Sequence, residues 1–252
     1  LIRPIQDVRL DAEQERQYGE WNRMALANAN FADRVREGLQ DDLITIGLEA
    51  NCNDLLGMLA GLKYDAAGNA RRVGLVFIDA HGDFNTPETT LSGMLGGMPV
   101  AISAGLALHN LREKSGLYAP IPTENIVMVA VRDTDPEEEE LIQAHDLARL
   151  STQDVREVSP ALHEQMRRLS EIADLIYVHV DMDVLDPREV QGHGLTVANG
   201  PTSQELAAAL AEMFRYPKVA GLGIASTPAY DADPGELSRR AAYRLIDGAL
   251  KG

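Results

Sequence analysis

Three potential metal ligands stand at every second position directly after an apolar run of strand length. The run covers residues 73–78, and the ligands that follow it are Asp79, His81 and Asp83. In an extended chain this spacing places all three side chains on one face. Carboxylate oxygens and a neutral imidazole suit manganese or a related divalent ion. The segment therefore predicts half of a metal site, with a polar turn as the alternative when it is taken alone.

A second apolar run, residues 175–180, ends in the same way. Asp181 and Asp183 follow it directly, and Asp186 comes three residues later. Two strands that each deliver carboxylates at their carboxyl ends predict a site for two metal ions. Such a site lowers the pKa of a water molecule, so that hydroxide exists near neutral pH.

The composition fits an enzyme of the cytoplasm. Lys and Arg total 23 against 39 Asp and Glu, which gives a formal net charge of −16. This charge argues against nucleic acid or an anionic membrane as a partner and weakly favours a cationic ligand. The single cysteine, Cys52, excludes an internal disulfide and suits a reducing compartment. Neither a membrane-spanning run nor a signal-peptide pattern is expected from the sequence.

Short apolar segments alternate with amphipathic ones, which predicts one α/β domain over residues 1–252, with a parallel sheet between helices. The expected strands cover residues 43–47, 73–78, 126–131, 175–180 and 219–224. The expected helices cover about residues 54–62, 100–108, 136–150, 160–172, 202–214 and from 234 onward. Ligands of such folds bind beyond the carboxyl ends of the strands. Polar residues from all five strand ends should therefore converge there.

The motifs at these strand ends resemble those of the ureohydrolase family, which comprises arginases, agmatinases and formimidoylglutamases. The resemblance is carried by segments 79–85, 92–99 and 181–187, and it covers roughly residues 43–230. It implies a three-layer α/β/α sandwich with a mostly parallel central sheet. It also implies a binuclear manganese centre that hydrolyses a C–N bond of a guanidino substrate, with urea as the commonest product. Related enzymes commonly form homotrimers or homohexamers.

The resemblance also implies roles for individual residues. The metal-ligand positions are matched by Cys52, Asp79, His81, Asp83, Asp181 and Asp183. One carboxylate, Asp83 or Asp181, would act as the catalytic base that takes a proton from the attacking water. The substrate-binding positions are matched by Asn85, Ser92, Asp135, Glu138 and Ser226. For the first four of these, polar groups that cap loop backbone are the alternative.

Three departures from the family pattern argue against an ordinary L-arginase. Cys52 stands where the first ligand is usually His, and it is either a soft ligand that favours zinc or iron or a small buried thiol. Gly96 replaces a His that shuttles protons, and Ser226 replaces an acidic residue that grips the guanidinium. Two hypotheses remain: a hydrolase of an arginine-like or hydroxyarginine-like substrate, and a degenerate member that acts as a binding or regulatory protein.

Two further histidines need an explanation. His179 lies inside the expected strand 175–180 and is either a hydrogen-bonded core residue or a neighbour of the metal-binding face. His193 lies in a loop that could close over the site and replace the missing proton carrier. A loop position without that role is the simpler interpretation of His193.

Overall fold

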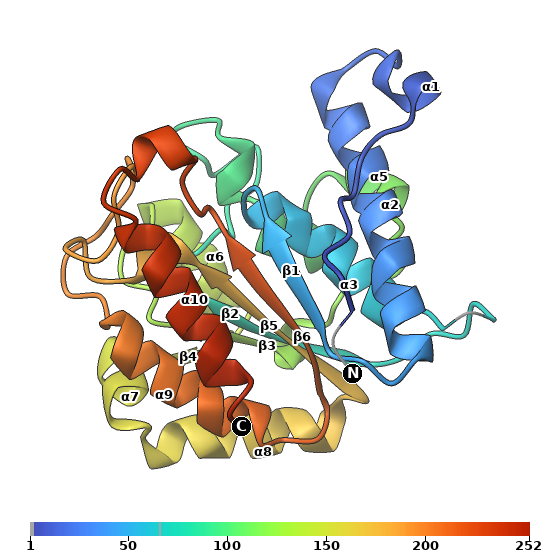
Figure 1. The fold of residues 1–252 in the computed structure, drawn as a ribbon. Helices are drawn as coiled ribbons and strands as arrows, with labels where there is room; N and C mark the ends of the chain where they lie inside the picture. Colours follow the sequence, from blue (N-terminus) through green and yellow to red (C-terminus); the bar gives the residue numbers. More distant parts are fainter. Residues whose placement is uncertain (1–2, 66) are drawn as a thin grey trace.

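A six-stranded parallel sheet lies between two layers of helices in the computed structural model, which describes residues 3–65 and 67–252 (Figure 1). The strand order is β1-β6-β5-β2-β3-β4, and every pair is parallel. The strands are β1 (Thr45–Glu49), β2 (Val73–Ile78), β3 (Ile126–Val129), β4 (Ala148–Leu150), β5 (Leu175–Asp181) and β6 (Val219–Ala225). The predicted three-layer α/β/α sandwich is confirmed.

The strands form because they carry apolar side chains on both faces, as parallel strands covered on both sides do. In β2, Val76 and Ile78 pack into the core on one face of the sheet, while Leu75 and Phe77 pack into the core on the other. Both cores are built in this alternating way, so each face of the sheet needs its own layer of helices.

Helices that follow one another in the sequence cover each face (Figure 1). One layer contains α7 (Thr152–Glu157), α8 (Pro160–Ile172), α9 (Ser203–Phe214) and α10 (Leu237–Ala249). The other contains α2 (Glu20–Gln40), α3 (Leu55–Lys63), α4 (Pro99–Ser103), α5 (His109–Lys114) and α6 (Pro136–Ala144). The short elements are α1 (Ala12–Glu15), η1 (Cys52–Asp54), η2 (Leu95–Gly97), η3 (Thr123–Asn125), η4 (Met182–Val184) and η5 (Tyr230–Ala232).

Several predicted elements are confirmed, and capping explains where the clearest of them starts. Thr202 is the N-cap of α9 and forms a capping box with Glu205, so the helix begins at Ser203 as the sequence indicates. Helix α8 has the predicted bounds, as does strand β2. The first strand lies two residues later than predicted, at Thr45–Glu49.

Two predicted helices were wrong in extent. The segment 100–108 is not one helix, because α4 ends at Ser103 and Gly105 has a φ of +82°, a value that interrupts a helix. The segment 136–150 is also divided, because α6 ends at Ala144 and the chain turns into β4 through Asp146, which has a φ of +49°.

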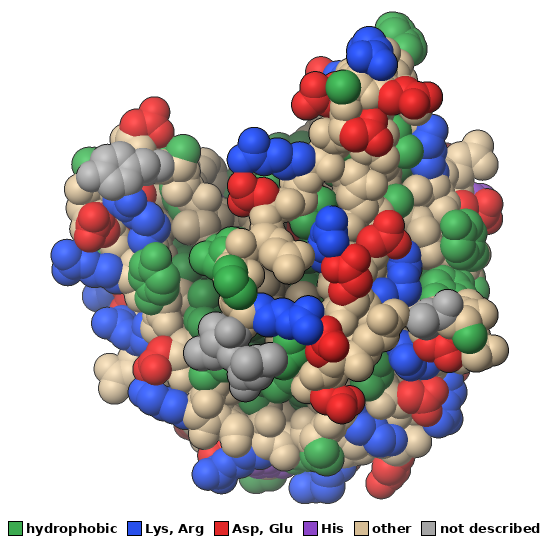
Figure 2. Space-filling view, turned by 45° about the vertical axis from the view of Figure 1, so that its right-hand side comes forward, with side chains coloured by type: hydrophobic (Ala, Val, Ile, Leu, Met, Phe, Trp, Pro, Cys, Tyr) green, Lys and Arg blue, Asp and Glu red, His purple; other side chains and the backbone are tan. Residues whose placement is uncertain are grey.

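The surface and the helix lengths bear on the expected partners. No helix among the described residues is both long and apolar enough to span a membrane. On the face shown in Figure 2, acidic and basic side chains are interspersed over the projecting α2 region and its surroundings. The negative charge does not gather into one patch on that face.

Candidate metal centre

The predicted ligands converge because they follow neighbouring parallel strands. Cys52 begins η1, just beyond the carboxyl end of β1. Asp79 and His81 follow β2, while Asp181 is the last residue of β5 and Asp183 lies in η4. Strand β5 lies between β6 and β2, so these segments meet at one edge of the sheet.

Two groups of ligand atoms share that edge. Cys52, Asp79 and Asp181 place ligand atoms within 4.8 Å of one another, and so do Asp79, His81 and Asp183. Asp79 belongs to both groups, and a carboxylate has two oxygens with which to bind. The arrangement can hold two cations side by side.

Backbone amides fix the carboxylates in place. The His81 amide donates to Asp79 Oδ1 at 2.8 Å, and the Asp183 amide donates to Asp181 Oδ1 at 2.9 Å. The imidazole of His81 lies between two carboxylates, with Nδ1 at 3.2 Å from Asp183 Oδ2 and 3.4 Å from Asp79 Oδ1. Each motif thus orients its own ligands through the turn that follows its strand.

Without a cation, the cluster must hold protons. Burial, and then the charges of neighbouring carboxylates, raise the pKa values of Asp79, Asp83 and Asp181. Burial alone would lower the pKa of His81, but hydrogen bonds and charges from Asp183 and Asp79 raise it to about 11. Divalent cations replace such protons when they bind, so the charge balance fits a metal centre.

Two buried atoms of the cluster have no hydrogen-bond partner among the described residues. They are Asp183 Oδ1 and His193 Nε2. Both residues belong to a third group of possible ligands, Asp181, Asp183 and His193, each of which has one ligand atom within 4.8 Å of the others. Buried polar atoms are almost always paired in native proteins. A cation would give both atoms a partner, so the residues present fit a bound metal.

Cys52 faces the cluster and is almost fully buried. Its Sγ lies 2.9 Å from Asp181 Oδ2 and 3.6 Å from Asp79 Oδ2. Burial, followed by the charge of Asp181, raises the pKa of the thiol well above its usual value. A thiol loses its proton when it coordinates a metal, so a cation would have to displace that proton. The structure therefore places Cys52 where a ligand would be, with the thiol as the form favoured in the absence of metal.

A buried polar network that sequence reasoning missed lies behind Cys52. His179 Nε2 is 3.3 Å from Cys52 Sγ, and its Nδ1 is 2.8 Å from the Tyr177 hydroxyl and 3.1 Å from Glu49 Oε2. Tyr177 donates to Glu49 Oε1 at 2.8 Å. His179 is fully buried, so it is a hydrogen-bonded core residue that also contacts the site.

The network crosses a strand, and a glycine makes the crossing possible. Glu49 is in β1 and Tyr177 in β5, with β6 between them, and Gly223 of β6 pairs with His179. A Cβ at position 223 would lie 2.1 Å from the Tyr177 hydroxyl and 2.5 Å from Glu49 Oε1. The position of Glu49, at the carboxyl end of a strand, was the sequence signal that could have identified it.

Asp83 is buried beside the cluster, but it belongs to none of the three groups formed by described residues. Its φ is +47°, in the left-handed region that Asp tolerates better than most residues. Asp181 is the carboxylate that contributes most to raising the pKa of Asp83, after burial. Asp83 thus lies close enough to interact with the centre electrostatically, and its role as a ligand stays a prediction.

A family comparison identifies the chain. The model of the Arginase family matches residues 16–250. The chain belongs to the arginase family. Arginase from Bacillus caldovelox is 31% identical over 184 residues, which cover 72% of this chain and 60% of that relative. Arginase from Entamoeba histolytica is 31% identical over 209 residues, which cover 78% of this chain and 69% of that relative. The matches to the first curated relatives span about three fifths of their length.

Solved structures agree with this family assignment. The structure of arginase from Bacillus caldovelox has a TM-score of 0.81 at 27% identity, covering 99% of this chain and 82% of that one. Formimidoylglutamase from Bacillus subtilis has a TM-score of 0.72 at 21% identity, covering 89% of this chain and 66% of that one, and it shares the fold. The expected resemblance to the ureohydrolases is confirmed.

In this arginase-family chain, three of the predicted substrate-binding residues lie together and also support a helix. Asp135 and Glu138 form the capping box at the start of α6. Asn85 Nδ2 donates to Asp135 Oδ2 at 3.1 Å. Glu138 is buried and accepts hydrogen bonds from the amides of Phe84, at 2.8 Å, and Asp135, at 3.2 Å. The backbone-capping alternative describes the contacts of Asp135 and Glu138, whereas Asn85 bonds to the side chain of Asp135. A contact of these residues with substrate stays a prediction.

Ser92 and Ser226 differ in their surroundings. Ser92 is exposed, and its hydroxyl accepts a hydrogen bond from the Met94 amide at 3.1 Å. Ser226 follows β6 with a φ of +61° and donates to Asp181 Oδ2 at 2.5 Å. The hydroxyl of Ser226 is thus hydrogen-bonded to a predicted metal ligand, and its contact with substrate stays a prediction.

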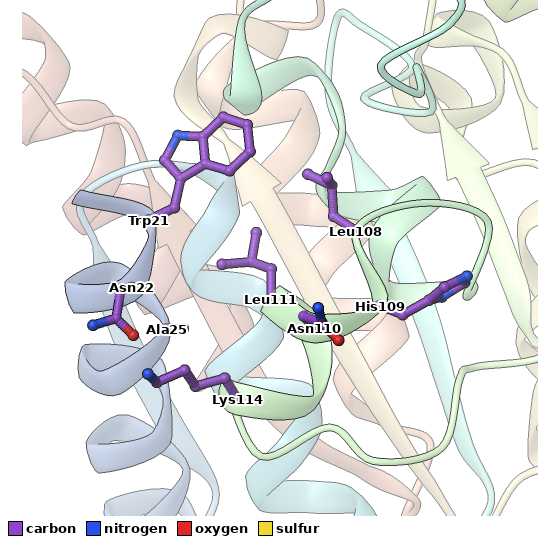
Figure 3. Close-up of a pocket in the computed structure, with 8 residues that line it drawn as sticks. All are labelled: Trp21, Asn22, Ala25, Leu108, His109, Asn110, Leu111 and Lys114. Atoms are coloured by element: carbon purple, nitrogen blue, oxygen red, sulfur yellow. The ribbon is translucent and has the colours of Figure 1, made fainter. Parts of the chain in front are cut away.

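A separate pocket of about 520 Å³ lies between α2 and α5 (Figure 3). Trp21 and Asn22 line it from α2, and Leu111 and Lys114 line it from α5. None of its lining residues belongs to the carboxylate cluster. This pocket is therefore distinct from the candidate metal centre.

Proposed function

We propose that this chain is a metal-dependent hydrolase that cleaves a C–N bond of a guanidino substrate. The observation that carries the proposal is the pair of ligand groups that share Asp79 at the carboxyl edge of the sheet. A set dominated by carboxylates with one imidazole suits manganese. Cys52 would shift the preference of its own position toward softer ions such as zinc or iron.

In this proposal the ligands are Cys52, Asp79, His81, Asp83, Asp181 and Asp183. The bound cations would supply Lewis acidity, which lowers the pKa of a water molecule in the site. Asp83 or Asp181 would take the proton of that water. Cys52 and Ser226 both contact Asp181 Oδ2 and hold that carboxylate in one orientation.

The substrate in this proposal is a cation or a close relative of one. Asn85 and Asp135 are hydrogen-bonded to each other, and the predicted substrate-binding set also includes Ser92, Glu138 and Ser226. A serine at position 226, in place of a carboxylate, loses charge-assisted hydrogen bonds to the guanidinium, which weakens its binding by on the order of 1.5–3 kcal/mol. We therefore favour an arginine-like or hydroxyarginine-like substrate over ordinary L-arginine.

Location and assembly are part of the same proposal. The chain has one cysteine, which lies buried and unpaired, as suits a cytoplasmic protein. We propose a homotrimer or a homohexamer, by analogy with the family, and light scattering coupled to gel filtration measures the mass directly.

The decisive experiment is the release of urea and hydroxyurea from a panel of guanidino compounds. The protein is loaded with manganese, and a matched sample contains EDTA. Turnover that EDTA abolishes would support the proposal and identify the substrate class. The variant Asp181→Asn should lose turnover. The variant Asp186→Asn makes the same chemical change at a residue paired with exposed Arg188 and should keep it.

The alternative function, a non-catalytic binding protein, has one observation in its favour. Cys52 and Ser226 both donate hydrogen bonds to Asp181 Oδ2, so this oxygen has partners without a cation. Silence across the panel with no metal bound would support this alternative. Silence with manganese bound would instead point to a substrate without a guanidino group.

A further inference from the structure

A second imidazole reaches the carboxylate cluster from the loop between η4 and α9. A ring nitrogen of His193 lies within 4.8 Å of carboxylate oxygens of both Asp181 and Asp183. His193 Nε2 is shielded from solvent and has no hydrogen-bond partner among the described residues. An unpaired buried polar atom is unfavourable, so a ligand that binds this nitrogen would stabilise the site.

Asp183, in the same group, also has an unpaired buried atom among the described residues. Asp183 Oδ1 is also buried and also without a hydrogen-bond partner among the described residues. An imidazole nitrogen and a carboxylate oxygen are both ligands of first-row divalent ions. The two residues have ligand atoms within 4.8 Å of each other, so one cation can bind both side chains.

The loop that carries His193 is hydrogen-bonded to α10 just before the histidine. The Gln191 amide donates to Ser238 Oγ at 2.8 Å, and Ser238 Oγ donates to the Gln191 carbonyl at 3.0 Å. Gly192 has a φ of +77°, and a Cβ there would lie 2.8 Å from the Ala232 carbonyl oxygen. A glycine is therefore needed at this turn, directly before His193.

Arg132 is hydrogen-bonded to the other end of the loop. Its guanidinium donates to the carbonyls of Ala198 and Val197, both at 2.9 Å, and to that of Val184 at 3.1 Å. Val184 ends η4, the element that contains Asp183. The Arg132 side chain therefore links the loop to η4, which contains Asp183. Hydrogen bonds hold the loop on both sides of His193.

We propose that His193 is a further metal ligand, acting with Asp181 and Asp183, so that cation binding adds a third attachment to the loop of residues 187–200. This inference rests on the metal centre of the proposed function. It gives the centre two imidazoles, His81 and His193, from two separate loops. Imidazole ligands suit iron, nickel, copper and zinc, whereas magnesium and calcium prefer oxygen ligands, so a second imidazole shifts the preference of the centre toward a transition metal.

The test measures metal binding and loop protection, independently of activity. Manganese is titrated calorimetrically into the metal-free protein, and hydrogen exchange is followed at residues 188–196 with and without manganese. The variant His193→Ala should bind manganese roughly tenfold or more weakly, as the loss of groups around metal sites does. It should also lose the manganese-dependent protection of the loop. The variant His193→Asp keeps a ligand atom and should restore much of both effects.

The variant His109→Ala serves as the matched control, because His109 is an exposed histidine outside the cluster. Unchanged manganese affinity in His193→Ala overturns the inference, provided that Asp183→Asn still abolishes binding, and it leaves the metal centre standing. Equal losses in His193→Ala and His193→Asp would show that the ring only packs in the loop, which also overturns it. Absence of manganese binding by the unmodified protein overturns the metal centre and this inference together.

Discussion

Removal of metal should make the stability of this protein fall as the pH rises from about 5 to 7. Asp79, Asp83 and Asp181 have pKa values raised by burial and by one another's charges. The folded metal-free protein therefore holds protons that the unfolded chain releases above a pH of about 4. Stability from such groups is present below that pH and is lost as the pH rises through the folded-state pKa values.

The magnitude follows from the number of protons retained. For each carboxyl that stays protonated in the folded state but not in the unfolded state, the free energy of unfolding falls by about 1.4 kcal/mol per pH unit. One such carboxyl gives about 2.7 kcal/mol between pH 5 and pH 7, or roughly 5–11 °C in melting temperature for a chain of this size. Above about pH 6.5 the raised pKa of His81 adds a change of the same sign.

Other groups do not mask the effect in this interval. Hydrogen bonds to Arg72 and Arg188 lower the pKa values of Asp174 and Asp186 to about 2. Their contribution is present above a pH of about 4 and is lost only as the pH falls toward 2. Burial also raises the pKa of Asp54, to about 6, and that of Glu138, and both groups add a fall in stability of the same sign. A variant within the cluster is therefore needed to assign the cluster's part of the change between pH 5 and pH 7.

The assay is thermal unfolding followed by circular dichroism at pH 5, 6 and 7, with EDTA or with manganese. The melting temperature should fall with pH in EDTA and change little in manganese, because cations then replace the protons. The variant Asp79→Asn removes one of the coupled carboxyls and should flatten the slope in EDTA. A melting temperature in EDTA that is constant or rises over this interval would refute the reasoning.

Three further predictions concern single positions. Cys52→His should raise manganese affinity relative to zinc in competition titrations, and unchanged affinities would remove Cys52 from the metal site. Gly223→Ala should lower the free energy of unfolding in urea by about 1–3 kcal/mol, because its Cβ would lie 2.1 Å from the Tyr177 hydroxyl. Gly221→Ala, whose nearest contact would be 3.3 Å, is the control, and equal losses would contradict the steric argument. Arg132→Lys should speed proteolysis within residues 187–200, because an ammonium cannot reproduce the spread of bonds to loop carbonyls; an unchanged cleavage rate would show that the loop does not depend on this side chain.

The ligand-bearing elements could be predicted because their signal is local. An apolar run followed by acids at alternate positions specifies a buried strand and the side chains at its end, and β2 and β5 have these properties. Parallel pairing then brings the strand ends together. By contrast, α2 gave little signal, because its buried face consists of Ala25, Asn28, Ala32 and Val35, which are small or polar. Helical spacing of such residues does not stand out from a solvated segment.

The rest of the site depends on contacts between segments distant in the sequence. The approach of Glu49 to Tyr177 requires the strand order and a glycine in the intervening strand, neither of which the sequence of β1 or β5 contains. The position of His193 depends on anchors at Ser238 and Arg132, which lie in other elements. For the same reason, the capping role of Asp135 could be anticipated, whereas its contact with Asn85 could only be inferred through the family resemblance.

The burial of the chain's only thiol has a practical consequence. Cys52 is 4% exposed and lies among Asp79, Asp181 and His179, so an alkylating reagent can reach it only when the local structure opens. Its alkylation rate therefore measures the opening of the β1–α3 connection directly, without any engineered label. Because no other cysteine competes for the reagent, the adduct mass of the intact chain gives that rate from a single peak.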